Sequence, residues 1–305
     1  MRSLRFQTYK VVLFILLRLP DFFYSFLFFI VFPVYKALHK KRAYGRVEKH
    51  LELARQHLAE KGINSAPLQK TTARDVFKGI FWNALESYRG LARFKSIEKR
   101  IVYENEHIIR NAIADCAKQN APIAGISIHQ GAFELMHRAL CRYSEHVHLI
   151  TDSVGDIAFR EVLKELRSDP HLTEYHPDET GHLIRKLFRT KGILAMVIDQ
   201  GKHTKGNTVS LFGRPSTLYL RLPQKINEMG AGIVTFRTWS EKKRIVIRFE
   251  NYYPPKYDAG IGNAETATSE STLVTGIAHE VETWITEHPE QWSWNYHGNF
   301  KTSNC

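Results

Sequence analysis

The chain has 305 residues, of which 43% are hydrophobic and 24% charged, so it can bury a sizeable core in one large domain or in two. Its three cysteines, Cys116, Cys141 and Cys305, are widely spaced and form no CxxC pair, which argues against a disulfide framework and a structural zinc site. The formal net charge of +12 favours an acidic partner, and nucleic acid, an anionic membrane and an acidic carrier protein all meet that description.

The N-terminal region contains a long apolar run, "VVLFILLRLPDFFYSFLFFIVFPVY", at residues 11–35. It is as long as the roughly 20 residues that a membrane span needs, and it ends in bulky side chains rather than at a small-residue cleavage site. We therefore interpret residues 1–44 as a retained membrane anchor. More basic residues follow the run than precede it, which predicts that the body of the protein lies on the cytoplasmic side of the membrane. Because Arg18 and Asp21 interrupt the run, an in-plane or re-entrant helix pair is the alternative.

Residues 45–305 show no repeat, low-complexity tract or long linker, so we treat them as one domain. Their periodicity predicts an alternation of helices and short apolar strands. The predicted helices are 46–61, 72–94, 104–119, 155–167, 179–190, 216–229 (broken near Pro223) and 266–287, and the predicted strands are 121–128, 146–151, 193–198, 232–239 and 244–250. This pattern predicts an α/β fold, a single domain with a largely parallel central sheet flanked by helices.

The stretch "ISIHQGAFELMHRAL" (126–140) runs from a buried strand through Gly131 into helical spacing. It places His129 beyond the carboxyl end of the strand, where open α/β sheets hold their chemistry. Glu134 lies five residues on and can converge with His129 across the turn. A carboxylate that holds one imidazole nitrogen lets the other accept a proton from an alcohol, so the pair suits general base catalysis. The simpler interpretation is a hydrogen-bonded histidine next to an exposed helix residue.

Two further segments extend this pattern along the chain. "MVIDQGKHTKGNTVSLFGRPSTLYL" (196–220) has an acidic strand end, then a loop and an apolar Phe-Gly segment, and "HPEQWSWNYHGNFKT" (288–302) lies near the C-terminus. Together with the anchor and the H-x4-E box at 129–134, these segments resemble the bacterial lipid A biosynthesis (late) acyltransferase family. The resemblance covers most of the chain in the right order. It implies transfer of a fatty acyl chain from acyl carrier protein to a lipid acceptor in a direct ternary complex.

The resemblance also implies roles for individual residues. His129 would be the base and Glu134 its orienting carboxylate, with the backbone amides of Ala132 and Phe133 as candidate oxyanion donors. Arg167 would bind an anionic acceptor or a phosphopantetheine phosphate, although a solvated charge at a helix end explains it equally well.

The later segment supplies the remaining candidates. Asp199, at the end of the 193–198 strand, would order the loop through 210 or a donor group, whereas a simple turn former is the alternative. Gln200 beside it would be a further substrate-binding residue. Phe212 and Gly213 would shape an acyl channel. Lys202, His203 and Lys205 would add positive potential near its mouth, or form only a solvated charged loop. The implied reaction requires no metal or other cofactor, because the donor carries its own phosphopantetheine.

Two departures from the family pattern bear on the acceptor. The chain ends in His297-Gly298-Asn299-Phe300-Lys301, where many members have two basic residues after the histidine. Its box has Gln130, Ala132 and Phe133, where the family favours an aromatic, an asparagine and a tryptophan. An acceptor other than lipid A, such as an aminolipid or a glycolipid, is therefore the alternative, with the same chemistry.

Other classes of function explain less of the sequence. A catalytically silent membrane-binding module on the same fold would not need His129 and Glu134. Nucleic acid is not expected as a partner, since the basic residues are spread out and no recognised module is present. His137, His146 and His148 have spacings that fit no standard metal site.

Overall fold

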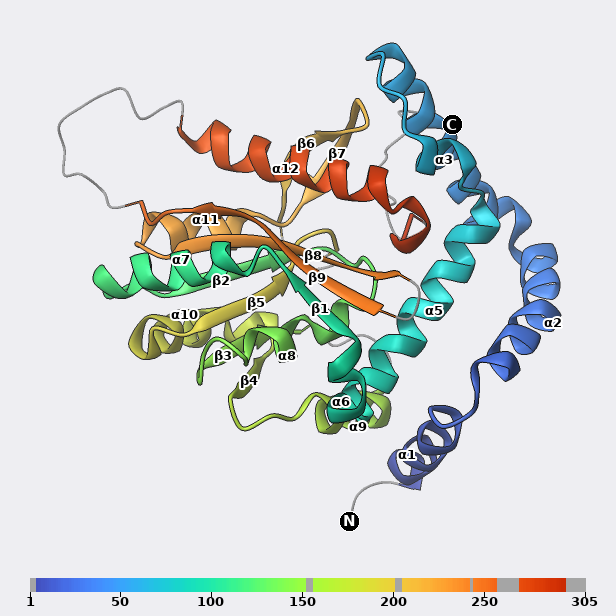
Figure 1. Ribbon diagram of the computed structural model, residues 1–305, viewed down its shortest axis with the longest axis horizontal. Helices are drawn as coiled ribbons and strands as arrows, with labels where there is room; N and C mark the ends of the chain where they lie inside the picture. Colours follow the sequence, from blue (N-terminus) through green and yellow to red (C-terminus); the bar gives the residue numbers. More distant parts are fainter. Residues whose placement is uncertain (1–3, 152–155, 201–204, 242–243, 257–268, 295–305) are drawn as a thin grey trace.

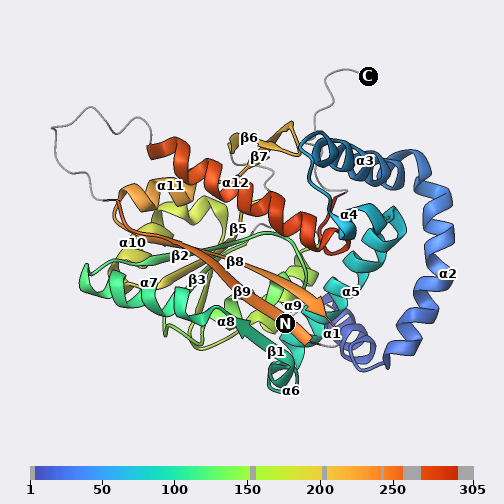
Figure 2. The ribbon, with the colours of Figure 1, turned by 45° about the horizontal axis from the view of Figure 1, so that its top comes forward.

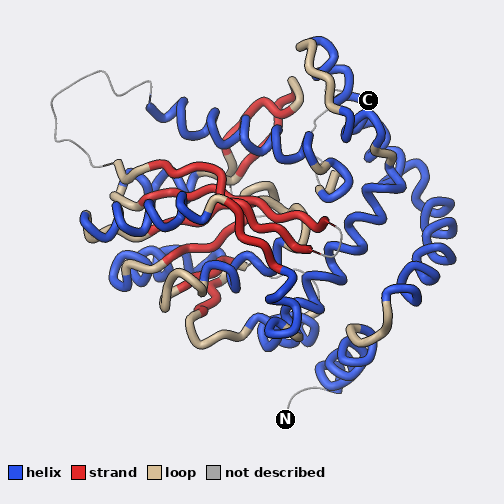
Figure 3. The backbone as a smooth tube through the Cα atoms, in the orientation of Figure 1, coloured by secondary structure: helices blue, strands red, loops and turns tan. Residues whose placement is uncertain are grey.

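The computed structural model describes residues 4–151, 156–200, 205–241, 244–256 and 269–294. Within these ranges the chain forms a seven-stranded sheet with helices on both faces, which confirms the predicted α/β fold (Figure 1). Figure 3 shows the strands enclosed by the surrounding helices.

The order of the strands in the sheet is β1-β9-β8-β2-β5-β3-β4. Strands β8, β2, β5, β3 and β4 run parallel to one another, whereas β9 is antiparallel to β8 and is joined at the edge by β1. The sheet is made of β1 (Ile101–Glu104), β2 (Ile123–Ser127), β3 (Val147–Ile150), β4 (Leu172–Tyr175), β5 (Ile193–Val197), β8 (Gly232–Glu241) and β9 (Arg244–Tyr253). A separate antiparallel hairpin consists of β6 (Asn207–Leu211) and β7 (Arg214–Leu218).

Helices surround this sheet, and most lie where the sequence predicts them. The α-helices of the domain are α3 (Gly45–Glu60), α4 (Ala66–Lys70), α5 (Ala73–Ala92), α6 (Phe94–Ile97), α7 (Glu106–Lys118), α8 (Met136–Leu140), α9 (Ile157–Arg167), α10 (Thr180–Thr190), α11 (Arg221–Glu228) and α12 (Ser269–Glu287). Shorter helical turns are η1 (Lys40–Tyr44), η2 (Glu98–Arg100), η3 (Phe133–Leu135), η4 (Pro177–Glu179) and η6 (Pro289–Gln291). Helix α5 begins with a capping box, in which Thr72 and Asp75 satisfy each other's backbone amides.

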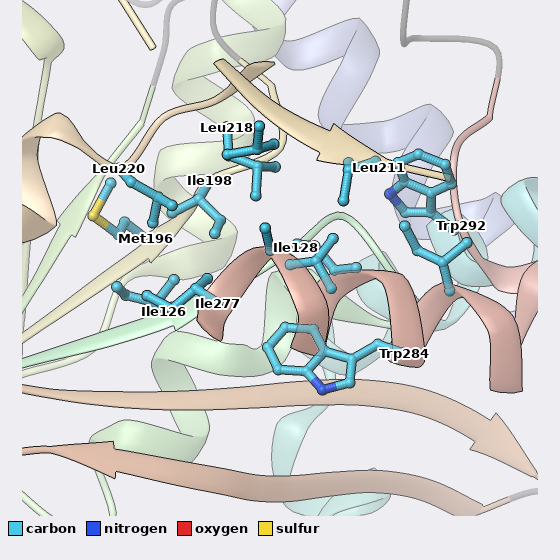
Figure 4. Packing of buried hydrophobic residues seen from close by; sticks show 14 of the residues in the cluster. Ile126, Ile128, Met196, Ile198, Leu211, Leu218, Leu220, Ile277, Trp284 and Trp292 are labelled. Atoms are coloured by element: carbon cyan, nitrogen blue, oxygen red, sulfur yellow. The ribbon is translucent and has the colours of Figure 1, made fainter. Parts of the chain in front are cut away.

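Alternate residues of the central strands point into two different cores, as strand geometry requires. Ala124 and Ile126 of β2 face the core beneath α12 and the hairpin, whereas Ile123 of the same strand faces the core beneath α7 and α8. Figure 4 shows the first core, where side chains from β2 and β5 meet α12, the hairpin and Trp292. Figure 2 shows α12 lying across the sheet beside that hairpin. The sheet is therefore buried on both faces.

The prediction of one helix over residues 216–229 is wrong in its first part. Arg214–Leu218 forms strand β7, and helix α11 begins only at Arg221. Pro223 therefore lies in the first turn of α11, where a missing backbone N–H costs nothing, and it neither kinks nor breaks the helix. The short edge strands β1 and β4 were not predicted either, because only one residue of each is fully buried and neither forms an apolar run.

The N-terminal apolar run forms two helices rather than one. Helix α1 spans Leu4–Leu16, and α2 spans Asp21–His39. Of the described helices, α2 alone is long and apolar enough to cross a membrane, with a mean hydropathy of 1.5 over its best window. The break falls at residues 17–20, the interruption that the sequence also marks.

Candidate active site

The register of two neighbouring strands brings His129 and Asp199 together. In the parallel pair β2 and β5, Ser127 is the partner of Val197, and the pairing continues because the Ile198 amide donates to the Ser127 carbonyl at 3.0 Å. Residues 129 and 199 each follow two positions later. Nδ1 of His129 lies 2.7 Å from Oδ1 of Asp199. Two side chains that are 70 residues apart in sequence therefore form one hydrogen-bonded pair at the carboxyl edge of the sheet.

Asp199 is wholly buried and receives several hydrogen bonds. Its side chain is 0% exposed. Besides the imidazole, the backbone amide of His129 donates to both carboxylate oxygens at 3.1 Å. The indole Nε1 of Trp292 donates to Oδ2 at 3.0 Å. A buried carboxylate needs such donors, and together they fix its position.

His129 is the accessible member of the pair. Its side chain is 20% exposed, and its ring meets the ring of Phe133 edge-on with centroids 4.5 Å apart. No residue in the described ranges forms a hydrogen bond with Nε2. With the Asp199 carboxylate accepting the proton of Nδ1, the lone pair belongs to Nε2, which is the arrangement that a general base requires.

The loop that carries His129 is pinned by its neighbours. Gly131 has φ +58°, a backbone conformation that residues with a side chain rarely adopt. A Cβ at this position would also lie 2.5 Å from the Thr238 carbonyl oxygen, so there is no space for a side chain. The Thr238 hydroxyl donates to the Gln130 carbonyl at 2.6 Å. The side chain of Gln130 in turn donates to the Trp284 carbonyl at 2.9 Å. Gln130, a departure from the family pattern, thus ties the loop to α12.

The segment Pro289–Trp292 braces the same loop from the other side. The Gln291 side chain donates to the Ser240 carbonyl at 2.9 Å and accepts from the Ser240 amide at 2.7 Å, so it extends the edge of β8. Its own carbonyl accepts from the Gly131 amide at 3.1 Å and from the Asn83 side chain at 2.8 Å. The sequence marks this segment by its Pro-Glu-Gln and tryptophan residues, but it gives no hint that Trp292 contacts Asp199.

Glu134 belongs to a second polar cluster. Arg167, the last residue of α9, donates through Nε and Nη2 to the two Glu134 oxygens at 2.8 and 2.7 Å. Its Nη1 lies 3.8 Å from the Glu174 carboxylate. Burial acts to raise the pKa of Glu134, but the charge and hydrogen bonds of Arg167 outweigh it and hold that pKa below its usual range.

The observed contacts of Glu134 and Arg167 differ from the roles that the sequence predicts for these two residues. Among the ion pairs of the described residues, the carboxylate that pairs with His129 belongs to Asp199, and Glu134 pairs with Arg167. The sequence assigns the orienting carboxylate to Glu134, because sequence distance favours it, whereas the sheet register favours Asp199. Two of the three guanidinium nitrogens of Arg167 bond to Glu134, so the predicted anion would have to compete for them.

Phe212 and Gly213 form the tight turn of the β6–β7 hairpin. Both have positive φ, 50° and 68°, which suits the two-residue turns that join twisted strands. The Phe212 ring stacks on Trp294 at 5.6 Å, and Trp294 contacts Trp292 edge-on at 4.9 Å. The turn is thus connected to Asp199 through two tryptophans. Its predicted part in an acyl channel stays a prediction.

The remaining candidates follow strand β5. Gln200 comes directly after Asp199 and is half-buried. Lys205 is exposed, whereas Lys202 and His203 lie outside the described residues, as does the terminal stretch 297–301.

Of His137, His146 and His148, the first and the last are buried, whereas His146 is exposed. His137 is buried beneath the Glu134 cluster, and burial lowers its pKa from 6.5 to about 3. His148 lies 3.0 Å from the Thr190 hydroxyl, and burial lowers its pKa to about 4. Among the described residues, no group of three histidine, cysteine or acidic side chains could hold a metal ion.

Comparison with known proteins identifies the family. The model of a family described as bacterial lipid A biosynthesis acyltransferase matches residues 85–302, a range that contains the whole sheet, His129, Asp199 and Trp292. A search of curated proteins gave no match. Because the match covers more than half of the chain and includes the site, the protein belongs to the bacterial lipid A biosynthesis acyltransferase family.

Proposed function

We propose that the protein moves a fatty acyl chain from the thioester of acyl carrier protein to a hydroxyl, or an amine, of a lipid acceptor at the cytoplasmic face of the bacterial inner membrane. The single observation that carries the proposal is the His129–Asp199 pair. An imidazole that is 20% exposed is held at 2.7 Å by a fully buried carboxylate, at the carboxyl edge of a parallel sheet in a chain of an acyltransferase family.

In the proposed reaction His129 acts as the base. Nε2 takes the proton of the acceptor hydroxyl while the oxygen attacks the thioester carbonyl. The new C–O bond forms, the C–S bond breaks, and the proton passes from the imidazolium to the departing thiolate of the carrier. Asp199 keeps Nδ1 protonated and the ring oriented, and it stabilises the imidazolium. The backbone amides of Ala132 and Phe133 are the proposed donors to the oxyanion.

Glu134 and Arg167 would support the base from the second cluster. The positive charge of a protonated His129 contributes to the lowered pKa of Glu134, so the Glu134 carboxylate would in return stabilise that imidazolium. Arg167 would hold Glu134 in place and balance its charge. The predicted binding of a phosphate by Arg167 would use Nη1, which has the longest of its contacts, 3.8 Å to Glu174.

Charge and family support the proposed partners. Acyl carrier proteins are acidic, and a chain with a net charge of +12 would attract one. The acceptor is lipid A or its precursor by family. The ending His297-Gly298-Asn299, in place of a histidine and two basic residues, favours a less phosphorylated polar lipid as the second candidate. The reaction needs no metal and no cofactor beyond the phosphopantetheine of the donor.

The test is mass spectrometry of total lipids from cells that express the wild type, His129→Ala or His171→Ala. His171 is an exposed histidine at the start of β4, near the opposite edge of the sheet, and it serves as the matched control. We expect one lipid to gain a single acyl unit with the wild type and the control but not with His129→Ala. Equal lipid profiles from all three proteins, each present in the membrane fraction, would instead favour the silent binding module.

A further inference from the structure

Helices α1 and α2 present large apolar side chains to the outside. We call Phe14 of α1 and Phe22, Phe26, Phe29, Val34 and Leu38 of α2 the outer stripe; each is more than half exposed, from 57% for Phe14 to 75% for Phe22. Figure 1 shows α2 as the outermost element on its side of the molecule, beyond α5. Exposed apolar surfaces of this extent mark a binding surface for a membrane or for another protein.

The opposite face of α2 packs along helix α5. Asp21 pairs with Arg89 at 2.5 Å at one end of the contact. Further along, the rings of Tyr24 and Phe28 lie 6.2 and 5.7 Å from Phe81. At the far end the rings of Phe32 and Tyr35 lie 6.1 and 5.3 Å from Phe77. The contacts recur every three or four residues of α2 while the partner numbers fall, so the two helices run antiparallel along one face.

This packing decides how α2 can meet a bilayer. Its 19 residues span about 28 Å at 1.5 Å per residue, which is close to the roughly 30 Å of the hydrocarbon core. If α2 crossed the membrane, α5 would enter the hydrocarbon with it. Helix α5 exposes Arg74 and Lys78. Its inner side packs against η3 and η6, which lie beside the loop of His129. Charged side chains are costly at that depth, so crossing and packing on α5 exclude each other.

Helix α1 is fastened to the domain in a similar way. Lys10 pairs with Glu165 at 2.5 Å, and Phe6 is buried against Ala158 and Val162 of α9. The outer stripe thus continues over two helices that both lie on the domain surface.

The charge around the stripe indicates what covers it. Residues 1–49 contain ten lysines and arginines but only two acidic residues, Asp21 and Glu48. A second copy of the same surface would bring like charges together. The headgroups of anionic lipids would complement them, with the long basic side chains reaching from the apolar face to the interface.

We propose that α1 and α2 lie in the plane of one membrane leaflet and do not cross the bilayer. The outer stripe is inserted among the acyl chains of the lipids. Helix α5 lies between the outer stripe and the carboxyl edge of the sheet, where His129 is found. The surface then holds the site at the headgroup level of the leaflet from which an acceptor lipid would come. This inference concerns the attachment to the membrane and is independent of the acyl-transfer reaction.

The test labels single cysteines on either side of α2. In a full-length background with the three native cysteines replaced by alanine, Gln7→Cys lies before α2 and Glu48→Cys after it, and both positions are exposed. Sealed membrane vesicles of each orientation are treated with a membrane-impermeant maleimide, and denatured samples give the full reaction. In-plane helices predict that both cysteines react from the same side. Reaction from opposite sides would overturn the proposal.

A second experiment distinguishes the lipid from a second copy. We expect Phe26→Asp combined with Phe29→Asp to lower the membrane-bound fraction at least tenfold, while the size of the detergent-solubilised protein stays the same. The matched control places aspartates at Ile63 and Met229, apolar residues that are 49% and 45% exposed elsewhere on the domain. A change from dimer to monomer without loss of membrane binding would contradict the proposal. Acyl transfer by solubilised wild type tests the reaction separately.

Discussion

The two polar clusters of the site use similar residues to different ends. In the first, a fully buried carboxylate, Asp199, holds Nδ1 of a ring whose side chain is 20% exposed, and no described residue forms a hydrogen bond with Nε2. In the second, Glu134 and Arg167 bond through both oxygens and two nitrogens, with side chains only 15% and 13% exposed. We call His129 and Asp199 the open cluster, and Glu134 and Arg167 the closed cluster. The open cluster can exchange protons with a substrate, whereas the closed cluster mainly holds its helices and strands in place. The two clusters differ in how far a substrate can reach their side chains, and a sequence pattern does not show this exposure.

The largest effect that we expect tests which carboxylate orients the proposed base, His129. Asp199→Asn keeps the shape but removes the charge that holds Nδ1–H, so the acyl-transfer rate should fall about 100- to 10,000-fold with little change in KM. Glu134→Gln should lower it much less. The rates are measured with purified proteins and the same donor. If the order of the two effects were reversed, the pairing expected from the sequence would be the functional one.

Removing the cation of the closed cluster should mainly affect stability. Arg167→Ala leaves Glu134 buried without its partner, and we expect the free energy of unfolding to fall by about 3–5 kcal/mol. The double variant Arg167→Met with Glu134→Leu should recover most of the loss. Denaturant unfolding of the solubilised proteins measures both. Unchanged stability together with a raised KM for the donor would favour the anion-binding role of Arg167 instead.

Trp292 and Trp294 offer a matched pair for the open cluster. Both are fully buried, but Trp292 donates to the Asp199 carboxylate and Trp294 to the Pro289 carbonyl. A hydrogen bond to a charged group is worth about 1.5–3 kcal/mol, so Trp292→Phe should reduce the transfer rate about tenfold. Trp294→Phe should have a similar effect on stability but a smaller one on rate. Equal rates for the two variants would mean that the indole does not help to position Asp199.

The last effect concerns the acid stability of the closed cluster. Burial lowers the pKa of His137 to about 3, so the folded protein stays unprotonated there while the unfolded chain takes up a proton below about 6.5. The stability contributed by the neutral histidine is complete above pH 6.5 and is lost as the pH falls toward 3, at about 1.4 kcal/mol per pH unit. Unfolding at pH 7 and pH 5 should show a smaller difference for His137→Gln than for the wild type. An equal difference would assign the acid sensitivity to other groups, such as His148.

Much of the fold could be predicted from local pattern. The central strands are apolar runs and most helices have clear periodicity, so the α/β sheet follows from the sequence. The hairpin at 207–218 could not, because its turn depends on positive φ at Phe212 and its strands are only partly buried. For the candidate site, the roles of the residues stay predictions, and the pairing of His129 with Asp199 could not be predicted from local pattern. His129 and Asp199 were each placed at a strand end, yet only the register of β2 against β5 sets them opposite each other.

That register has a consequence for how the chain becomes active during folding. His129 and Asp199 come from segments separated by the crossover through β3, α9, β4 and α10, so the loop-closure cost of this long-range contact must be met before the pair can form. Until β2 and β5 pair, the imidazole has no partner to select its tautomer. The proposed base therefore gains its carboxylate only once β2 and β5 have paired.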